Sequence, residues 1–336
     1  MKICMIGFGG IAKSHLRGYL NTMAEGKCDN TLVAICDIDP ARFDAKIKMN
    51  IDTGEDTLPA SIRRYTDWEE MVETEQPDIV DLCIPTYLHC EIACKAMEKG
   101  VNVQCEKPMA LNRADCKKMI ETAKRTGKKL MVGMCLRFEP LYLELKKMVE
   151  DGRYGSVRSA YFDRLSALPR WGFENWFPDV SRSGGVALDM HIHDVDIIPY
   201  IFGTPLALSA TVAGDEECAC RSIHSNFIYD DKIISAVGEW GMSDGWPFSM
   251  SYRVNFEKAT VVSDTKGVIT VYPAGEEPFV HEYRARQRMK DQQEYFADVV
   301  RGMDNTVLPP ESAMETVIRV EKLMESAAKK GEKVSI

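Results

Sequence analysis

Residues 2–12 read Lys-Ile-Cys-Met-Ile-Gly-Phe-Gly-Gly-Ile-Ala, an apolar run that ends in a glycine turn. The run 3–6 predicts a buried β-strand, and Gly7, Gly9 and Ala12 form the pattern G-x-G-x-x-A. Where such a turn leads from a strand into a helix, the first two glycines allow a tight turn and the close approach of a pyrophosphate to backbone N–H groups. The small third residue lets the helix pack on the strand. The stretch therefore predicts the first βα unit of a dinucleotide-binding domain.

The first third of the chain alternates short apolar, β-rich runs with longer helical patterns, as βαβ units around a parallel sheet do. Strands are expected at residues 3–6, 31–36, 63–65, 79–84, 102–105 and 130–133. Six such strands predict an α/β fold with a doubly wound parallel sheet. We assign this Rossmann domain to residues 1–135.

The pattern changes after about Pro140, where a helix over 141–150 precedes runs that alternate or are β-rich. Turn-like residues at 230–231 and 266–267 suggest antiparallel connections. The chain closes on helices, one of which we expect to open at Ser312, because Ser312 and Glu315 have capping-box spacing after two prolines. Residues 136–336 therefore predict an α+β domain, with strands at 233–240, 249–256, 260–263 and 268–272.

Charge and composition narrow the class of partner. Forty-two Lys and Arg against 51 Asp and Glu give a net charge of −9, so nucleic acid and anionic membranes are disfavoured and a small-molecule substrate fits better. The sequence contains no apolar run long enough to span a bilayer, and it enters a strand-like stretch directly instead of a signal peptide. Eleven scattered cysteines predict reduced, buried thiols. We expect a cytoplasmic protein with no metal site, because Cys218 and Cys220 have no partner pair at zinc-ligand spacing.

The second predicted strand ends at Asp37, where a carboxylate can hydrogen-bond the adenosine ribose of a dinucleotide. The same carboxylate would repel a 2′-phosphate, and Ile38-Asp39 supplies no arginine to receive one. NAD is therefore favoured over NADP. The alternative is that Asp37 is a cap or turn residue ahead of Pro40, although Asp39 is better placed for that role.

Two further segments carry groups suited to catalysis. Glu106-Lys107-Pro108 follows the fifth strand, where the Lys107 ammonium could stabilise an alcohol oxygen as hydride leaves the same carbon; the alternative is a solvated surface lysine. Asp189 and His193 are four residues apart after a glycine turn, so on one helix they would share a face and His193 could accept a proton. We expect a structural role for His191, and helix-surface or interdomain positions for two neighbouring acids, Asp194 and Asp196.

The chain resembles the GFO/IDH/MocA oxidoreductase family through four elements in order. These are the glycine turn at 7–10, Pro-Thr-Tyr-Leu-His at 85–89, Glu-Lys-Pro at 106–108, and Gly184-Gly185 through Asp189 and His193. The resemblance implies a C-terminal domain with a large, mostly antiparallel open sheet, substrate bound between the domains, and a homodimer or homotetramer. The chain departs from the family at Thr86, where many members have Asn, and at His191, where a small residue is common.

The resemblance also implies roles for single residues. Lys107, Asp189 and His193 would be catalytic and would also bind substrate, together with Arg164, Trp171, Trp176 and Tyr283. For the tryptophans, a place in the core or in an oligomer interface is the alternative. The cofactor would contact Gly7, Phe8, Gly9, Gly10, Ile11, Asp37, Ile38, Pro85, Thr86, His89, Glu106, Lys107 and Arg137.

The sequence as a whole predicts an NAD-dependent dehydrogenase that oxidises a secondary hydroxyl of a sugar, sugar derivative or cyclitol reversibly. One alternative is a redox-neutral enzyme that retains NAD, of the glycosidase or aldose-aldose oxidoreductase type. Another is a non-catalytic dinucleotide or sugar sensor. The choice of sugar and of hydroxyl depends on loop geometry and on a few hydrogen bonds in the folded protein.

Overall fold

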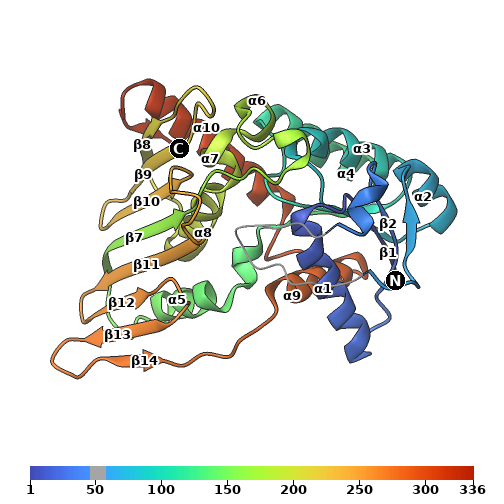
Figure 1. Cartoon of the computed structure of the whole chain (residues 1–336). Coiled ribbons are helices and arrows are strands. Elements are labelled where there is room, and N and C mark those ends of the chain that lie inside the picture. The colour runs from blue at the N-terminus through green and yellow to red at the C-terminus, as the bar shows by residue number, and fades with distance from the viewer. Residues whose placement is uncertain (46–57) are drawn as a thin grey trace. The chain divides into compact units, whose positions relative to one another are not determined.

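The computed structural model describes residues 1–45 and 58–336, which form two compact units (Figure 1). The first unit contains Met1–Cys135, Arg170–Trp176 and Gln287–Glu315. The second contains Leu136–Pro169, Phe177–Arg286 and Thr316–Ile336. The first unit thus includes two later stretches besides the N-terminal residues 1–135.

The first unit is built on a six-stranded parallel sheet of order β3-β2-β1-β4-β5-β6. All six predicted strands are confirmed, and the order reverses between β1 and β4, as in a doubly wound fold. The strands are β1 Lys2–Ile6, β2 Thr31–Cys36, β3 Arg63–Tyr65, β4 Ile79–Leu82, β5 Asn102–Cys105 and β6 Leu130–Val132.

Helix α1 packs against helix α9, although the two lie far apart in the sequence (Figure 1). A Cβ on Gly18 of α1 would lie 2.3 Å from Oε1 of Gln293 and 3.2 Å from the backbone nitrogen of Lys290 on α9, so the two helices pack closely at this glycine. Helices α3 and α4 pack against each other. The helical segments of this unit are α1 Gly10–Glu25, η1 Pro40–Phe43, α2 Trp68–Glu75, η2 Thr86–Leu88, α3 His89–Glu98, α4 Arg113–Thr126, η4 Phe173–Asn175 and α9 Arg288–Val300.

The second unit contains a nine-stranded sheet of order β14-β13-β12-β11-β7-β10-β9-β8-β15. Neighbouring strands in this sheet are antiparallel, except for the parallel pair β7 and β10. This confirms the predicted mostly antiparallel sheet. The strands are β7 Val157–Leu165, β8 Ala207–Ala213, β9 Ser222–Ile228, β10 Ile233–Glu239, β11 Ser249–Phe256, β12 Ala259–Ser263, β13 Ile269–Pro273, β14 Phe279–His281 and β15 Val334–Ser335.

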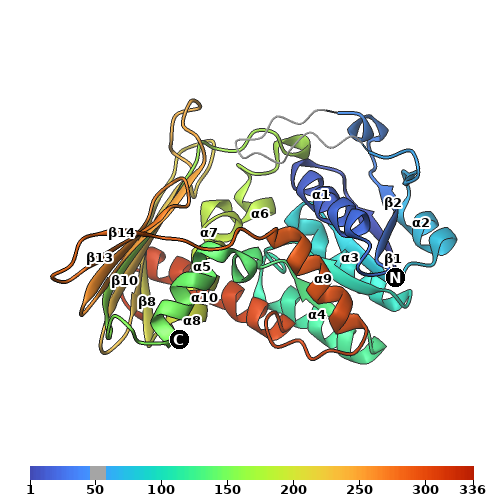
Figure 2. The ribbon, with the colours of Figure 1, turned by 90° about the horizontal axis from the view of Figure 1, so that it is seen from below.

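Helices α5, α7 and α8 lie on one side of this sheet, which Figure 2 shows nearly edge-on. Phe162 of β7 packs edge-on against Phe202 of α8, and Tyr142 of α5 lies beside Tyr252 of β11, so aromatic side chains fill the layer between. The helices with most of their residues in this unit are α5 Pro140–Glu150, α6 Val180–Ser183, α7 Gly185–Asp189, α8 Ile192–Phe202 and α10 Pro310–Ala328, preceded by η3 Cys135–Phe138.

The start of α10 corrects the sequence prediction. The helix begins at Pro310, so Ser312 lies inside its first turn and its hydroxyl donates to the carbonyl of Pro309. Proline fits the first turn because the N–H that it lacks would have no partner in the helix. The prolines therefore open the helix, ahead of the capping pattern.

The opposite face of the sheet carries polar side chains that bond across strands. Ser235 donates to Asn226 at 2.7 Å, and Asn226 donates to Ser209 at 3.3 Å. Asn255 donates to Ser159 at 2.9 Å. Alternation of buried and exposed residues along β9 and β10 places apolar side chains toward the helices and these polar groups on the open face.

All eleven cysteines lie in the described residues, and no disulfide joins any of them there. Nine are buried.

Among the helices of residues 1–45 and 58–336, none is long and apolar enough to cross a bilayer.

Candidate active site

The glycine turn leaves the N-terminus of α1 open to a ligand. Gly7 has φ +91° and packs so closely that a Cβ would lie 2.4 Å from the carbonyl oxygen of Cys83. Gly9 behaves differently, because a Cβ there would meet no described atom within 4 Å. Among the described residues, no side chain caps the helix at Gly9 and no acidic residue lies in its first turn. The uncapped N–H groups and the helix dipole therefore fit a pyrophosphate.

Asp37 is held at the end of β2 beside this turn. Its Oδ2 accepts a hydrogen bond from the Phe8 N–H at 2.7 Å, and Oδ1 accepts one from the Asp39 N–H at 2.9 Å. The cap of η1 is made by Asp39, whose carboxylate accepts from Ala41, while the bond from the Asp39 N–H gives Asp37 a turn-stabilising role beside its predicted contact with the ribose. Ile38 is exposed.

Phe8, predicted as a cofactor contact, places its ring in the core. The ring is fully buried, lies 6.0 Å from the ring of Phe43, and carries the Lys13 ammonium 3.5 Å above its centroid. Burial lowers the pKa of Lys13 to about 8. The ring is therefore part of the core, and a contact of Phe8 with the cofactor would be made by its backbone.

Pro85 and Thr86 open η2 directly after β4, at the carboxyl edge of the sheet where ligands of such folds bind. His89, predicted to contact the cofactor, is instead buried between two loops. Its Nδ1 lies 2.8 Å from the carbonyl oxygen of Pro108 and its Nε2 lies 2.9 Å from that of Ile84. Burial lowers its pKa below 6.5. His89 therefore ties the loop after β4 to the turn after β5.

Glu106 and Lys107 follow β5, as the sequence predicts, but the Glu106 carboxylate turns inward. Its Oε1 lies 3.0 Å from Nε2 of the buried His15, and its Oε2 accepts from the backbone N–H of Lys107 at 3.3 Å. This geometry supports a role in holding the turn, in place of the predicted contact with cofactor. Lys107 itself is only partly buried.

Asp189 and His193 lie in the second unit on two successive helices, which corrects the prediction of one shared helix. Asp189 is the last residue of α7 and His193 is the second residue of α8. Between them the N–H of His191 donates to the carbonyl of Val186, five residues back, at 2.8 Å. The chain departs from regular α-helix geometry here, and both residues stay close to the break.

His191 has the structural surroundings that the sequence predicts. It is fully buried, with Nε2 2.8 Å from the Ser225 hydroxyl and Nδ1 3.6 Å from Asp194. Gly238 of β10 faces it so closely that a Cβ there would lie 2.8 Å from the Cβ of His191. The ring therefore packs α8 onto the sheet.

Asp194 and Asp196 are buried ion-pair partners, which corrects their placement on a helix surface. Arg164 donates to Asp194 from Nε at 3.1 Å and from Nη2 at 3.0 Å, and also donates to Tyr142. Arg137 donates to Asp196 at 2.9 and 2.6 Å. Each acid can be buried because its carboxylate accepts two hydrogen bonds from one arginine guanidinium.

These pairs also bear on two predicted ligand contacts. Arg164 is fully buried, with its guanidinium directed at Asp194, Tyr142 and Met250, so the geometry supports a structural role in place of substrate binding. Arg137, expected at the cofactor, stacks its guanidinium 4.8 Å from the ring centre of Tyr200 while it binds Asp196.

The remaining substrate candidates fall in different units. Trp171 and Trp176 lie in the first unit, on either side of Glu174 and Asn175, whose φ angles of 48° and 49° are strained for residues with side chains. Such strain concentrates at functional sites, which favours this loop. Trp171 is partly exposed, whereas Trp176 is buried, which supports the core alternative for Trp176. Tyr283 lies in the second unit, and its hydroxyl donates to the Gly267 carbonyl at 2.6 Å, which supports a structural tether.

Sequence reasoning missed a buried polar cluster behind Glu106. Asp81 is fully buried in β4 and accepts hydrogen bonds from Tyr19 at 2.8 Å and from Gln104 at 3.3 Å, while it also contacts His15. The available signal was an aspartate inside the apolar run Ile79–Leu82, because a carboxylate in a central strand needs a buried partner.

The chain matches two family models. Residues 1–134 match the GFO/IDH/MocA model described as an oxidoreductase family with an NAD-binding Rossmann fold, and residues 142–262 match the GFO/IDH/MocA C-terminal domain. An aldose-aldose oxidoreductase from Caulobacter crescentus has a similar fold, with a TM-score of 0.83 at 22% identity over 100% of this chain and 99% of that one.

Two curated relatives are more similar in sequence. A 2,7-anhydro-N-acetylneuraminate hydratase from Mediterraneibacter gnavus is 31% identical over 216 residues, 61% of this chain and 54% of that protein. A myo-inositol 2-dehydrogenase from Thermotoga maritima is 32% identical over 205 residues, 60% of this chain and 55% of that protein. The chain thus spans about half the length of these relatives. With both domain models matched in order, the chain belongs to the GFO/IDH/MocA oxidoreductase family and carries that family's NAD-binding Rossmann domain.

Proposed function

We propose that the chain is an NAD-dependent dehydrogenase that moves hydride reversibly between the nicotinamide and a secondary hydroxyl of a sugar, sugar derivative or cyclitol. The observation that carries the proposal is the position of Lys107 at the carboxyl end of β5, within the NAD-binding unit of this oxidoreductase family. Ligands of doubly wound sheets bind at that edge.

Bound NAD supplies the hydride acceptor, and the protein supplies binding and proton handling. The open N-terminus of α1 at Gly9 holds the pyrophosphate, and Asp37 receives the adenosine ribose hydroxyls. His193 takes the proton of the substrate hydroxyl as the hydroxyl carbon loses hydride and becomes a carbonyl carbon. Lys107 hydrogen-bonds the same oxygen and stabilises its growing negative charge.

In the proposed reaction Asp189 holds either the His193 imidazole or a substrate hydroxyl. Pro85 and Thr86 line the nicotinamide half of the cofactor site, and the partly exposed Trp171 offers an aromatic face to the C–H surface of a sugar ring. The names of the relatives, an anhydro-sialic acid hydratase and an inositol dehydrogenase, support a polyhydroxylated substrate.

A second candidate is a redox-neutral reaction that uses tightly held NAD. It is favoured by the hydratase among the relatives, because hydration adds water without net oxidation of the substrate. In this case the hydride would return to the substrate within one turnover, so product would form without accumulation of NADH.

The test is NADH formation by the purified protein with added NAD across cyclitols, aldoses, uronates and amino sugars. Reduction with one stereochemical group supports the dehydrogenase and identifies its substrate class. Product formation without net NADH, with NAD bound to the purified protein, supports the redox-neutral reaction instead. Reduction of NADP in preference to NAD contradicts the role of Asp37.

A further inference from the structure

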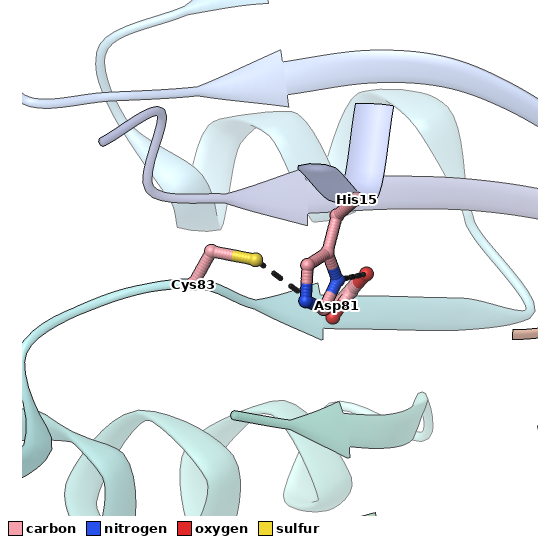
Figure 3. A group of neighbouring side chains, drawn as sticks. All are labelled: His15, Asp81 and Cys83. Atoms are coloured by element: carbon pink, nitrogen blue, oxygen red, sulfur yellow. Dashed lines mark hydrogen bonds and ion pairs between the residues drawn. The ribbon is translucent and has the colours of Figure 1, made fainter. Parts of the chain in front are cut away.

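A buried histidine, His15, connects the turn that contains Glu106 and Lys107 to the core of the first unit. His15 lies on α1 with its side chain fully buried, and its Nδ1 is 2.7 Å from Oδ2 of Asp81 (Figure 3). Its Nε2 is 3.0 Å from Oε1 of Glu106. One imidazole therefore bridges two buried carboxylates that come from the ends of neighbouring strands, β4 and β5.

The surroundings of His15 favour the doubly protonated ring. Both ring nitrogens face a carboxylate oxygen at hydrogen-bond distance, and only an imidazolium can donate at both. Burial alone would lower the pKa of His15, but the charge of Asp81 outweighs it and the pKa lies well above 6.5. Burial likewise raises the pKa of Glu106, but the hydrogen bond and charge of His15 outweigh it and the net pKa falls.

Other titratable groups around the ring are neutral near pH 7. The thiol of Cys83 lies beside the ring in Figure 3, and burial raises its pKa to about 12. The pKa of Tyr19 is also raised, by burial and by the charge of Asp81. The amides of Gln104 and Gln293 complete the shell, the first on Asp81 and the second on the backbone oxygen of His15.

His15, Asp81 and Cys83 lie close enough together to be considered as ligands of a metal ion, but the contact between His15 Nδ1 and Asp81 Oδ2 is a hydrogen bond. Two ligand atoms on one tetrahedral zinc lie about 3.3 Å apart, from bonds of about 2.0 Å. The separation of 2.7 Å between His15 Nδ1 and Asp81 Oδ2 is that of a hydrogen bond. A proton, and not a metal ion, therefore links His15 to Asp81.

The Oε2 atom of Glu106 accepts a hydrogen bond from the backbone N–H of Lys107. The contact between His15 and Glu106 is therefore connected to the Lys107 backbone. Gly133 allows the approach, since a Cβ there would lie 2.8 Å from Oε1 of Glu106. On the other side of Lys107, the carbonyl of Pro108 is bound by His89. The backbone around Lys107 is thus fixed by two buried histidines.

We propose that His15 is a positioning residue for the reaction: as a cation between Asp81 and Glu106, it fixes the Glu106 carboxylate and, through it, the backbone that presents Lys107. This inference rests on the proposed function where it connects Lys107 to catalysis. His15 does not contact substrate or cofactor in this role, and its effect is transmitted by Glu106.

The experiment compares His15→Gln with the double variant His15→Gln/Asp81→Asn. The single variant leaves two buried carboxylates without a cation, whereas the double variant leaves one carboxylate among neutral amides. We expect His15→Gln to lower kcat about 10- to 100-fold, with the Kd for NADH within about threefold of wild type, the size expected when a positioned group is displaced. The double variant should recover most of that loss.

Two further measurements do not depend on turnover. In His15→Gln, one carboxyl should take up a proton in the folded state, so the unfolding free energy should fall relative to wild type as pH rises from about 4.5 to about 6, where wild-type His15 is protonated in both the folded and the unfolded state. Backbone hydrogen exchange in the peptide that spans 106–109 should become faster. Both effects should be reversed in the double variant.

Tyr19→Phe is the matched control, because it removes a hydrogen bond from Asp81 and leaves all charges in place. It should lack the new pH dependence and the faster exchange at 106–109. A double variant no better than His15→Gln, or His15→Gln with unchanged kcat and exchange, overturns the proposal. Expected exchange and pH effects in a protein that turns over no substrate would instead contradict the proposed function and leave the positioning role standing.

Discussion

Lys107 is the residue on which the proposed chemistry depends most directly. Replacement by methionine keeps the length of the side chain but removes the ammonium that stabilises the alcohol oxygen. We expect Lys107→Met to lower kcat about 10²- to 10³-fold, as the loss of one positioned donor does in other enzymes. The Kd for NADH should change little in a fluorescence titration, and an unchanged kcat would remove Lys107 from the mechanism.

The Arg164–Asp194 pair tests what it costs to remove one partner of a buried ion pair. Asp194→Asn would leave the guanidinium of Arg164 buried without its anion. We expect a loss of about 3–5 kcal/mol in the free energy of unfolding at pH 7, measured with urea. The exposed pair Lys117–Glu121 supplies a control, since Glu121→Gln should cost less than about 1 kcal/mol. Equal losses in the two variants would contradict this account.

For single residues, the sequence predicted the position along the secondary structure better than the direction of the side chain. Glu106 and Lys107 lie after β5 as predicted, because a strand followed by a polar turn is readable from the pattern. The direction of the Glu106 side chain is set by His15, which lies 91 residues away in the sequence. Arg164 and Asp194 likewise find each other only in the folded chain, so the sequence assigned them to substrate and surface.

Among the elements, the turn into α1 contains two glycines with different expected roles: Gly7 in folding and Gly9 in cofactor binding. Gly7→Ala would strain a positive φ angle and collide with the Cys83 carbonyl, whereas a Cβ at Gly9 has open space. We expect Gly7→Ala to lower the melting temperature by several degrees, as a loss of roughly 1–3 kcal/mol does. Gly9→Ala should melt near the wild-type temperature and weaken NADH binding at least about tenfold, because its methyl group occupies the space above the helix N-terminus.

Calorimetry and NADH titration of the same two preparations check this contrast. Normal NADH affinity in Gly9→Ala would mean that the pyrophosphate does not approach the helix end at that glycine. A stable Gly7→Ala protein would mean that the turn tolerates a wider path than the structure shows.

The elements of the first unit were predictable because buried parallel strands are continuous apolar runs. In the second unit, β10 to β13 were found from turn residues and alternation, but β7, β8, β9 and the short β14 and β15 were missed. The exposed faces of β7, β8 and β9 carry Ser, Asn and Thr, which reduce the apolar signal. The break between α7 and α8 was also missed, because it reflects packing of His191 against Gly238, a contact between distant parts of the chain.

For the whole molecule, buried charges predict a stability maximum between about pH 4 and about pH 6.5. The pKa of Asp194 is pushed up by burial, but Arg164 and His191 outweigh this and hold it below 3.8. Such a carboxyl contributes stability above its unfolded pKa and loses it as pH falls through its folded pKa. His15 behaves oppositely, because its raised pKa contributes stability below about 6.5 that is lost as pH rises through the folded value.

Urea unfolding at a series of pH values checks the acid side. The unfolding free energy should fall steadily below about pH 4, with a smaller dependence in Asp194→Asn, since that variant has one fewer carboxylate to protonate. An identical acid dependence in wild type and variant would show that Asp194 does not contribute to it.

The open face of the nine-stranded sheet predicts self-association. Helices lie on one side, and the other side offers a broad surface of cross-strand polar pairs. We expect a homodimer or homotetramer, hence a mass of two or four times 37.9 kDa by light scattering. Ser235→Arg on this face should lower the mass without loss of stability, whereas Glu121→Arg on α4 should not. A wild-type monomer would contradict the prediction.

The assembly of the first unit from three separate stretches has a consequence for how the protein is made and how it can be cut. Helix α9, which packs so closely on Gly18 of α1, leaves the ribosome long after the glycine turn has emerged. The nucleotide-binding half therefore cannot be completed during synthesis until nearly the whole chain is available. For the same reason no single proteolytic cut releases it, and a fragment ending at residue 135 would expose the side of α1 that α9 covers.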